Sequence, residues 1–177
     1  MIIETKRMKL IPYSAEQMRL SLRDPVGAAA MIGAKTIRPG YLEMLSRGRI
    51  YAAKIHNMED EPRAWLFGTY WQMVQKGTDA IVGELGFKGP PVKSEIEIGY
   101  GMQEPFRNRG YMTEAVCALC QFAFSQNDYP VQRVVAATEK NNFASQRVLE
   151  KSGFAQVRRQ GRLLVWHKEH APGLSQL

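Results

Sequence analysis

The sequence predicts a single α+β domain in which helices flank a central mixed sheet. Three observations favour this fold class. Helix start signals dominate the first third of the chain, alternating apolar residues dominate the middle, and an apolar helical stretch separates two strand patterns near residues 100 and 135. Strands joined by such a helix lie parallel in one sheet, whereas the alternating strands before them favour antiparallel pairing.

The N-terminal residues predict a strand and then a helix. Residues 2–11 partly alternate between polar and apolar side chains, which indicates the first strand. Ser14 and Gln17 have the spacing of a capping box, in which each side chain satisfies a backbone N–H group at the start of a helix. We therefore expect a helix that ends near Arg23.

Two further helices are predicted before the sheet continues. Asp24 followed by proline indicates a helix start, and Gly33 indicates its end. Residues 38–58 have a helical pattern that Gly48 could interrupt, and the polar residues 58–63 predict a loop.

The middle of the chain predicts three strands in a meander. Their residues are aromatic or β-branched in many positions, and we expect the strands at 64–75, 80–88 and 95–102. A turn at 76–79 and a proline-containing break at 89–94 would separate them. The third strand alternates strictly, so Glu95, Glu97 and Gly99 share one face.

The last third predicts two helices and three strands. A helix of about fifteen residues begins at Arg109, and a buried strand follows at 131–138. A shorter helix covers 141–154, with asparagine at its start and Gly153 at its end. Two closing strands at about 154–160 and 162–168 would meet in a turn at Gly161.

Composition limits the class of protein. The 177 residues are 45% hydrophobic and 23% charged, which fits one soluble domain with a sizeable core. The longest apolar runs fall well short of the roughly 20 residues of a membrane span. The first residues have no long apolar segment typical of a signal peptide, and two cysteines are too few for a disulfide framework. We therefore expect a cytoplasmic protein.

The net charge of +7 indicates an anionic partner. A positive total does not choose among nucleic acid, a membrane surface and a phosphorylated cofactor. Because no basic run reaches five residues and no nucleic-acid motif is present, we expect no nucleic-acid partner and no membrane partner. The densest basic stretch, VRRQGR at 157–162, is compatible with a solvated hairpin.

The stretch FRNRGYMTEA at 106–115 is the clearest candidate site. The start of a helix leaves four backbone N–H groups unpaired and carries a partial positive charge, so anions bind there. Gly110 would let a ligand approach the backbone, and Arg107 and Arg109 supply donors suited to phosphate oxygens. A solvated helix start is equally compatible with these residues. Neither the Walker loop nor the GxGxxG fingerprint occurs.

The same stretch resembles a known family. RNRGYM at 107–112 resembles the Q/R-x-x-G-x-G/A signature of the GNAT superfamily of acyl-CoA-dependent N-acetyltransferases. Residues 95–116, EIEIGYGMQEPFRNRGYMTEAV, look like the acetyl-CoA region of the branch related to ribosomal-protein N-terminal acetyltransferases. Residues 138–154 are similar to the second motif of that branch, and GFKGPP at 86–91 completes a resemblance that covers about 64–168. Met112 departs from the usual small residue, although a flexible methionine can be accommodated there.

The resemblance implies a single-domain GNAT fold over 1–177, with a twisted, mostly antiparallel sheet and two splayed parallel strands. It also implies acetyl-CoA as cosubstrate, with its pantetheine arm between strands 95–102 and 131–138 and no metal. The strand residues expected to contact the pantetheine are Ile98, Tyr100, Gly101 and Met102. The residues expected around the diphosphate are Arg107, Asn108, Arg109, Gly110, Tyr111, Met112 and Thr113. Asn142 and Ser145 would lie near the thiol.

The implied reaction needs a base, donors for the developing oxyanion and an acid for the departing thiol. Glu97 is the first candidate for the base, directly or through a water, and Glu84 is the second. A bulge at Gly99 and Gly101 could present a backbone N–H group near Tyr100–Met102 to the oxyanion. Ser145 is the candidate acid by resemblance. A glutamate in a sheet-face salt bridge, or a serine bonded to its helix backbone, would look the same in the sequence.

The acceptor is the least determined part of the prediction. A primary amine is implied, with a protein N-terminus favoured by the branch and a small-molecule amine as a close alternative. A non-catalytic basic module that binds CoA or RNA is the rival class. The sequence is compatible with a monomer or a homodimer. Cys117 and Cys120 lie on an apolar helix and are predicted to be core residues, and the three histidines lack ligand spacing.

Overall fold

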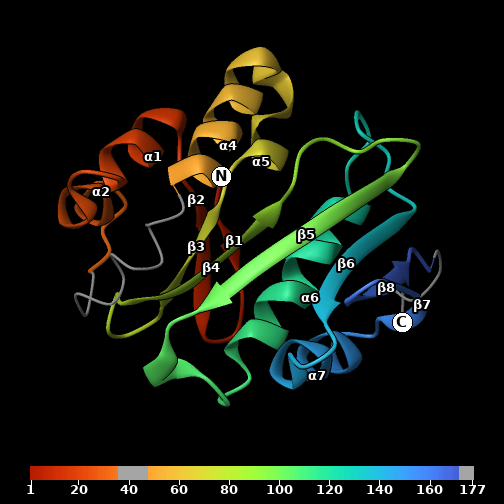
Figure 1. The fold of residues 1–177 in the computed structure, drawn as a ribbon. Coiled ribbons are helices and arrows are strands. Elements are labelled where there is room, and N and C mark those ends of the chain that lie inside the picture. The colour runs from red at the N-terminus through yellow and green to blue at the C-terminus, as the bar shows by residue number, and fades with distance from the viewer. Residues whose placement is uncertain (36–47, 172–177) are drawn as a thin grey trace.

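The computed structural model describes residues 1–35 and 48–171. A twisted eight-stranded sheet forms its centre, in the order β1-β2-β3-β4-β5-β6-β8-β7 (Figure 1). The strands are β1 Ile3–Glu4, β2 Met8–Pro12, β3 Trp71–Gln75, β4 Ile81–Phe87, β5 Glu95–Met102, β6 Arg133–Glu139, β7 Ala155–Gln160 and β8 Leu163–Glu169. All neighbouring pairs are antiparallel except β5 and β6, which are parallel. The predicted mixed, mostly antiparallel sheet is confirmed.

Helices cover both faces of this sheet. Their bounds are α1 Ala15–Ser21, α2 Pro25–Met31, α4 Gly48–Asp60, α5 Trp65–Gly68, α6 Tyr111–Phe124 and α7 Phe143–Lys151, with short 3-10 turns at Pro62–Ala64 and Glu104–Phe106. Apolar side chains of α1, α2 and α4 pack with β3 in one cluster, whereas those of α6 and α7 pack with the central strands in another. The domain therefore has three layers.

The predicted helix signals are confirmed where the structure describes them. Ser14 and Gln17 form both hydrogen bonds of the capping box, and the Asp24 side chain accepts from the backbone N–H of Gly27. Gly33 has a φ of 67°, a left-handed conformation in which glycine ends a helix without strain. Residues 38–47 of the predicted third helix lie outside the described residues. From Gly48 the helix continues to Asp60, slightly beyond the predicted end.

Two predicted strands are wrong in extent. Residues 2–11 form two short antiparallel strands, because Thr5 turns the chain: its N–H donates to the Met8 carbonyl, and the Met8 N–H donates to the Thr5 hydroxyl. Residues 64–70 are not the start of a strand but a short helix and its exit. The strand predicted at 64–75 begins only at Trp71. Pro62, at the first position of a helical turn, is the local signal that favours helix there.

The predicted bulge in β5 is also wrong. Strand β5 pairs with β4 in one unbroken register, which runs from Ile98 opposite Phe87 to Met102 opposite Gly83. Register shifts occur instead between β3 and β4, at Met73 and Val74, and between β7 and β8, at Gln156 and Arg158. The glycines of β5 therefore keep regular strand geometry.

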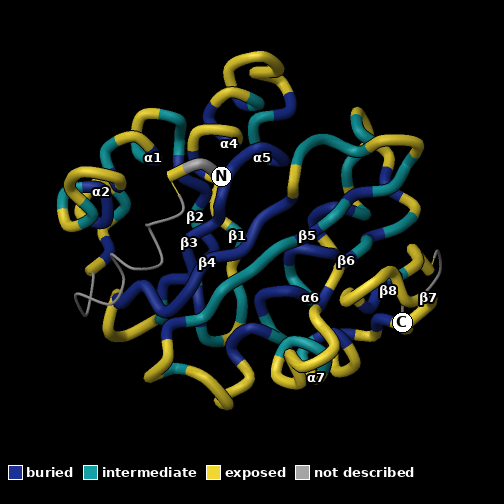
Figure 2. Tube along the Cα trace, viewed as in Figure 1, coloured by how far each residue is buried: buried dark blue, intermediate teal, exposed yellow. Residues whose placement is uncertain are grey.

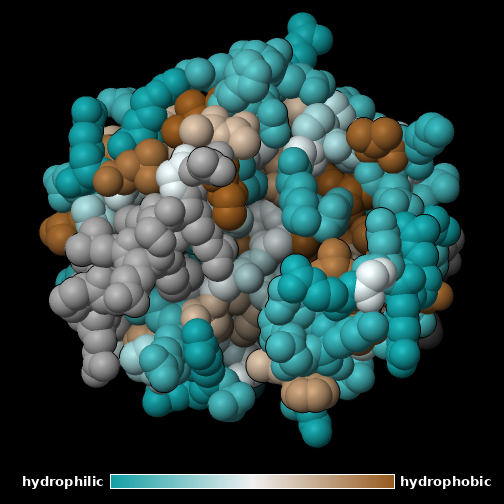
Figure 3. Space-filling view, viewed as in Figure 1, coloured by the Kyte–Doolittle hydropathy of each residue, from teal (hydrophilic) through white to brown (hydrophobic). Residues whose placement is uncertain are grey.

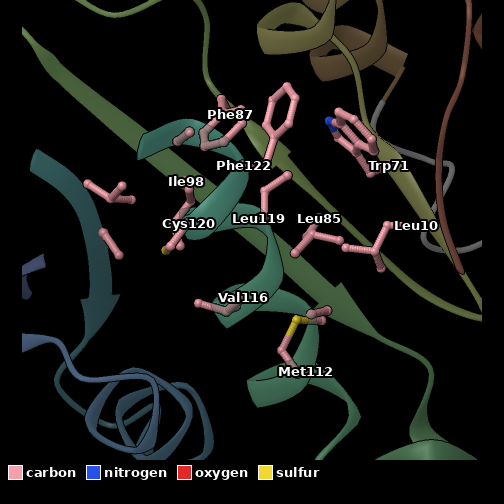
Figure 4. Close-up of a cluster of buried hydrophobic side chains, with 14 of the residues drawn as sticks. Leu10, Trp71, Leu85, Phe87, Ile98, Met112, Val116, Leu119, Cys120 and Phe122 are labelled. Carbon is pink, nitrogen blue, oxygen red and sulfur yellow. The ribbon is translucent and has the colours of Figure 1, made fainter. Parts of the chain in front are cut away.

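The main core lies between the sheet and α6. Val116, Leu119 and Cys120 of α6 gather against Leu85 and Ile98 of the central strands (Figure 4). Cys120 is fully buried, and burial raises the pKa of its thiol to about 12. The prediction of a core residue is therefore confirmed for Cys120, whereas Cys117 is only half-buried. Strands β3 and β4 are buried almost throughout, whereas every residue of the edge strand β7 is exposed (Figure 2).

The surface is largely polar on the face shown in Figure 3. Large apolar side chains that are exposed in the described chain are scattered, and the most exposed are Val92 and Phe143, at 70% each. Within residues 1–35 and 48–171, every helix is too short or too polar to cross a membrane.

Candidate functional site

The candidate site begins where β5 and β6 separate. The two strands pair only from Glu95 to Glu97 on β5, opposite Arg133 to Val135 on β6. Beyond these three pairs the strands diverge. The predicted splayed parallel strands are therefore present.

Strand register determines which backbone groups face the gap. The Lys88 N–H donates to the Glu97 carbonyl, and the Gln103 N–H donates to the Val82 carbonyl. Because antiparallel strands bond at alternate residues, the odd-numbered residues of β5 use their backbone groups towards β4. The backbone groups of Ile98, Tyr100 and Met102 consequently point to the side of β6, as a ligand lying between the strands requires.

The loop after β5 leads into the start of α6. Asn108 has a φ of 61° and Gly110 a φ of 76°, so two left-handed residues shape this turn. Gly110 is the N-cap of α6, and the first N–H groups of the helix follow it. A left-handed N-cap needs glycine, because a side chain there would strain the backbone.

A cavity of about 1010 Å³ connects this loop with the gap. Its lining contains eleven of the sequence-predicted cofactor residues: Tyr100, Gly101, Met102, Arg107, Asn108, Gly110, Tyr111, Met112, Thr113, Asn142 and Ser145. Ile98 is instead buried in the core at 3% exposure, and the Arg109 guanidinium lies 5.9 Å from the centre of the Phe106 ring. Unpaired helix donors, a glycine and cationic side chains around one cavity fit a diphosphate.

The sequence prediction missed part of the lining. Phe106 closes one side, and α7 adds Phe143, Ala144, Arg147, Val148 and Lys151. Residues 143, 147 and 151 lie four apart and therefore share one helix face. Since Asn142 and Ser145 were already predicted to be near the ligand, this periodicity could have identified the remaining face of α7.

Met112 lies partly in the core, which explains how it fits the site. Its side chain is 6% exposed and lies beside Val116 in the core (Figure 4). The departure from the family signature therefore leaves the helix backbone accessible from the cavity.

Tyr100 and Ser145 meet across the gap. The hydroxyl oxygens are 2.8 Å apart, and the Tyr100 hydroxyl also lies 3.3 Å from the Ser145 carbonyl oxygen, to which it can donate. Burial raises the pKa of Tyr100 to about 12, although the hydrogen bond with Ser145 acts in the opposite direction. Asn142 caps α7 by accepting from the Ser145 N–H. The phenol is therefore a protonated donor at neutral pH, close to the cavity.

Glu97 lies outside this cavity. It forms an ion pair with Lys88, and its side chain is 36% exposed. Both residues line a second hollow of about 650 Å³ at the other end of β5. Glu97 as general base stays a prediction, and the ion pair is the structural role weighed against it.

Glu84 is buried under α4. Its exposure is 1%, and the Tyr51 hydroxyl donates to Glu84 Oε2 at 2.7 Å. Burial, and secondly the charge of Glu84, raises the pKa of Tyr13 above its usual value. Glu84 lies directly opposite Gly101 across the β4–β5 pair. Because side chains alternate along β5, Glu84, Gly101, Gly99 and Glu97 occupy the same face of the sheet.

Gly99 leaves an opening between the two carboxylates. A Cβ atom built there would have no atom of the described residues within 4 Å. Since Glu84 is aligned with Gly101, Gly99 is two residues from each carboxylate position along β5. The face that carries α4 thus has an open position between two candidate bases.

No group of three histidine, cysteine or acidic side chains in the described residues could hold a metal ion.

Comparison with known proteins identifies the family. The model of the "Acetyltransferase (GNAT) domain" family matches residues 36–155. The chain belongs to the GNAT acetyltransferase family. The uncharacterized N-acetyltransferase YjdG of Bacillus subtilis is 40% identical over 85 residues, which cover 48% of this chain and 49% of YjdG. The chain thus spans about half the length of the curated relatives it matches.

Solved structures extend the GNAT fold over nearly the whole chain. The acetyltransferase from Agrobacterium tumefaciens matches with a TM-score of 0.64 at 20% identity, covering 96% of this chain and 95% of that one. RimL, a ribosomal L7/L12 α-N-protein acetyltransferase in complex with coenzyme A, matches with a TM-score of 0.61 at 17% identity, covering 96% and 98%. At such low identity the likeness shows the shared fold.

Proposed function

We propose that this protein is an acetyl-CoA-dependent N-acetyltransferase that acts on a primary amine. The observation that carries the proposal is the single cavity that joins the start of α6, the open edge of β5 and the Tyr100–Ser145 pair. Membership of the GNAT family gives this cavity its expected ligand. The α6 N-terminus and Gly110 would hold the diphosphate, and the backbone of Tyr100 and Met102 would hold the pantetheine.

Acetyl-CoA supplies a thioester carbon that a neutral amine attacks, so that a C–N bond forms, the C–S bond breaks and CoA leaves as a thiol. A proton must therefore be removed from the amine, and protonation of the sulfur assists its departure. Tyr100 can donate because burial keeps it protonated, and water in the open cavity can return a proton to it through the hydroxyl of Ser145, to which it is hydrogen-bonded. The backbone N–H of Tyr100 faces the gap and can stabilise negative charge on the carbonyl oxygen.

For the base we retain Glu97 as first candidate and Glu84 as second. Both lie on the sheet face that carries the opening at Gly99, which makes this face the proposed acceptor side. Lys88 holds the Glu97 carboxylate in an ion pair, whereas Glu84 is buried beside Tyr51. The variants Glu97→Gln and Glu84→Gln distinguish the two candidates. If only one of them loses kcat, the residue replaced in that variant is the base.

The favoured acceptor is the α-amino group of a peptide. With a reference pKa near 8, roughly a tenth of such groups is neutral at pH 7, against well under a thousandth of lysine side chains. An α-amine therefore needs less help from a base. The similarity of fold to RimL, named as an α-N-protein acetyltransferase, supports the same choice.

The test is thiol release from acetyl-CoA with a panel of peptides and small amines. We expect CoA release with peptides that have a free N-terminus and none with N-terminally blocked peptides that retain lysine. Turnover with polyamines or free amino acids alone would reject the peptide acceptor. Tight CoA binding without turnover on any amine would instead favour the non-catalytic module.

The cofactor half is tested separately with Gly110→Asp. An aspartate at position 110 would be strained at the left-handed φ of 76°, and its negative charge would repel a diphosphate there. We expect CoA binding to be lost. Because the left-handed backbone also strains the variant, Gly161→Asp, at a left-handed turn outside the cavity lining, is the matched control. Retained CoA affinity in Gly110→Asp would show that the cofactor site lies elsewhere.

A further inference from the structure

Arg7 connects the N-terminal hairpin to the start of α6. It lies in the turn between β1 and β2, and both of these strands contact α6. Its backbone N–H donates to Glu114 Oε1 at 2.8 Å, and its Nε donates to Glu114 Oε2 at 2.7 Å. Its Nη1 donates to the Arg109 carbonyl oxygen at 2.8 Å, and the guanidinium lies 4.3 Å from the centre of the Tyr111 ring. One side chain thus binds the last loop residue before the helix cap and two residues of the first helical turn.

The bond to the Arg109 carbonyl fixes the peptide that precedes Gly110. Peptides in the described chain are trans, so the carbonyl of Arg109 and the N–H of Gly110 point in opposite directions. Holding the carbonyl towards the hairpin turns this N–H away from the hairpin. Asn108 and Gly110 both line the cavity, so the freed donor lies where a diphosphate oxygen would accept it.

Arg7 also forms an ion pair with Glu114, whose carboxylate lies at the start of α6. Glu114 lies in the first turn of α6, and its side chain is 19% exposed. Burial favours the neutral acid, but hydrogen bonds from Thr5 and Arg7 outweigh it and lower the pKa of Glu114. Without Arg7, an ionised Glu114 would oppose an anion at the same helix end.

We propose that Arg7 is a positioning residue for the diphosphate of CoA and that the β1–β2 hairpin is part of the cofactor site. This inference rests on the proposed function for the identity of the ligand. Arg7 acts through the Arg109–Gly110 peptide, and its charge balance with Glu114 is the smaller contribution. A segment about one hundred residues from the motif in sequence therefore sets the geometry of the motif.

The test measures dissociation constants of CoA and of S-acetylpantetheine, which lacks the diphosphate, by titration calorimetry without an amine. For Arg7→Ala we expect the Kd of CoA to rise about tenfold, the effect of weakening one hydrogen bond to a charged group, with the Kd of S-acetylpantetheine unchanged. Arg7→Lys should recover little, because a single ammonium nitrogen lacks the rigid planar fork with which Nε and Nη1 reach two separate acceptors. In turnover, the KM of acetyl-CoA should rise with kcat unchanged.

The double variant Arg7→Ala/Glu114→Ala separates positioning from charge. We expect it to bind CoA as weakly as Arg7→Ala. Full recovery of affinity would show that only the charge of Glu114 matters and would overturn the proposal, as would an unchanged Kd in Arg7→Ala. Equal losses for CoA and S-acetylpantetheine would mean general loosening of the fold and would also overturn it.

Arg19→Ala is the control, because Arg19 also forms an ion pair, with Glu59, but lies outside the cavity lining. We expect its Kd values to equal those of the wild type. A wild type that binds no CoA would refute the proposed function and this inference together. A wild type that binds CoA but transfers no acetyl group would refute only the proposed function.

Discussion

The hydroxyl of Tyr100 links β5 to α7 at the point where the sheet is open. Its contact with Ser145 depends on how far the strand and the helix diverge, which no sequence pattern specifies. The resemblance to the GNAT family implied that Tyr100 and Ser145 both lie near the ligand. That the two hydroxyls meet, and that burial raises the pKa of the phenol to about 12, is visible only in the fold.

Removal of this hydroxyl should slow the chemical step. For Tyr100→Phe we expect kcat to fall about tenfold. This loss is smaller than the one usual on removal of a general acid, because a thiol with a pKa near 8.5 leaves without full protonation. The KM of acetyl-CoA should change little, since the ring remains. Because the Tyr100 pKa is about 12, wild-type kcat should show no loss up to pH 10 from ionisation of this group.

Tyr129→Phe removes an exposed hydroxyl that bonds Glu61 and serves as the control. Steady-state kinetics of both variants decides the matter. Equal kcat values in Tyr100→Phe and the wild type would remove Tyr100 from the mechanism.

Lys54 is a buried cation in the described chain. Its Nζ donates to the carbonyl oxygens of Phe87, Thr69 and Gly68 at 2.6, 3.2 and 3.3 Å, and it lies 4.3 Å from the centre of the Tyr70 ring. Burial lowers its pKa from 10.5 to about 8, against the attraction of Glu84, which acts in the opposite direction. The ammonium holds α4 to the ends of β4 and α5.

The lowered pKa of Lys54 makes the free energy of unfolding depend on pH. Between pH 8 and pH 10 the unfolded chain binds more protons at Lys54 than the folded chain, so this group makes the free energy of unfolding rise with pH. The full cost of burying the charge is present below pH 8. Relative to Lys54→Met, the wild type should gain on the order of 2 kcal/mol between pH 7 and pH 10.

Urea unfolding of the wild type and Lys54→Met at a series of pH values measures this gain. Lys140→Met, which replaces a lysine at an exposed position, is the control for loss of a lysine charge. A constant difference between the wild type and Lys54→Met would mean that the buried amine has an ordinary pKa.

At the scale of elements, most of the fold could be predicted where local signals and tertiary packing agree. The cap residues Ser14, Asp24 and Asn142 all form their predicted bonds, because a cap depends on residues three positions apart. Strand β5 was predicted with its exact bounds, since its alternation matches one buried and one open face.

The prediction failed at α5 because packing overrides propensity there. Trp65 and Phe67 favour a strand by residue type, yet Phe67 packs with Phe87 and Phe122 in the main core from a helical turn. A Cβ atom at Gly68 would lie 2.8 Å from the Met58 side chain, so glycine lets α5 approach α4 closely. Such an approach between distant elements leaves no periodic signal in the sequence.

Strand β5 also supplies a test of the acceptor side. Because a side chain at Gly99 would enter open space in the described structure, Gly99→Leu should preserve the fold and fill the proposed acceptor position. We expect the KM of the peptide to rise at least about tenfold from steric exclusion, with the Kd of CoA unchanged.

Gly99→Ala is the graded control, and its effect on the peptide KM should be small. The opposite case is Gly86, where a Cβ atom would lie 2.4 Å from the Thr69 carbonyl oxygen, so that Gly86→Ala should lower stability. An unchanged peptide KM in Gly99→Leu would place the acceptor elsewhere.

At the scale of the whole molecule, the net charge of +7 indicated an anionic ligand but not its position. The motif at 107–112 predicted the position of the diphosphate, since the proposed diphosphate site is built from a contiguous loop and helix start. The carboxylates that flank Gly99 come from two strands, and their relation follows from register, which the sequence does not fix.

The three residue pairs between β5 and β6 have a consequence for cooperativity. Within the described sheet, these pairs join two groups of strands. One group contains β1 to β5, and the other contains β6, β8 and β7. The two groups can therefore open as separate units. A ligand that bonds to β5 and packs on α7 would couple them. At a CoA concentration of 100 times its Kd, linkage predicts about 2.7 kcal/mol of added stability.

Hydrogen exchange with and without CoA would show this coupling directly. Amides of Tyr100 and Met102, together with those at the end of β6, should gain protection together, while α1 and α2 change little. Protection confined to the α6 start would mean that the two groups of strands remain independent when the ligand is bound. In that case the gap in the sheet would serve only as a binding site. Joint protection would instead make the cofactor a structural component of the folded protein. Depletion of CoA would then lower the lifetime of the protein as well as its activity.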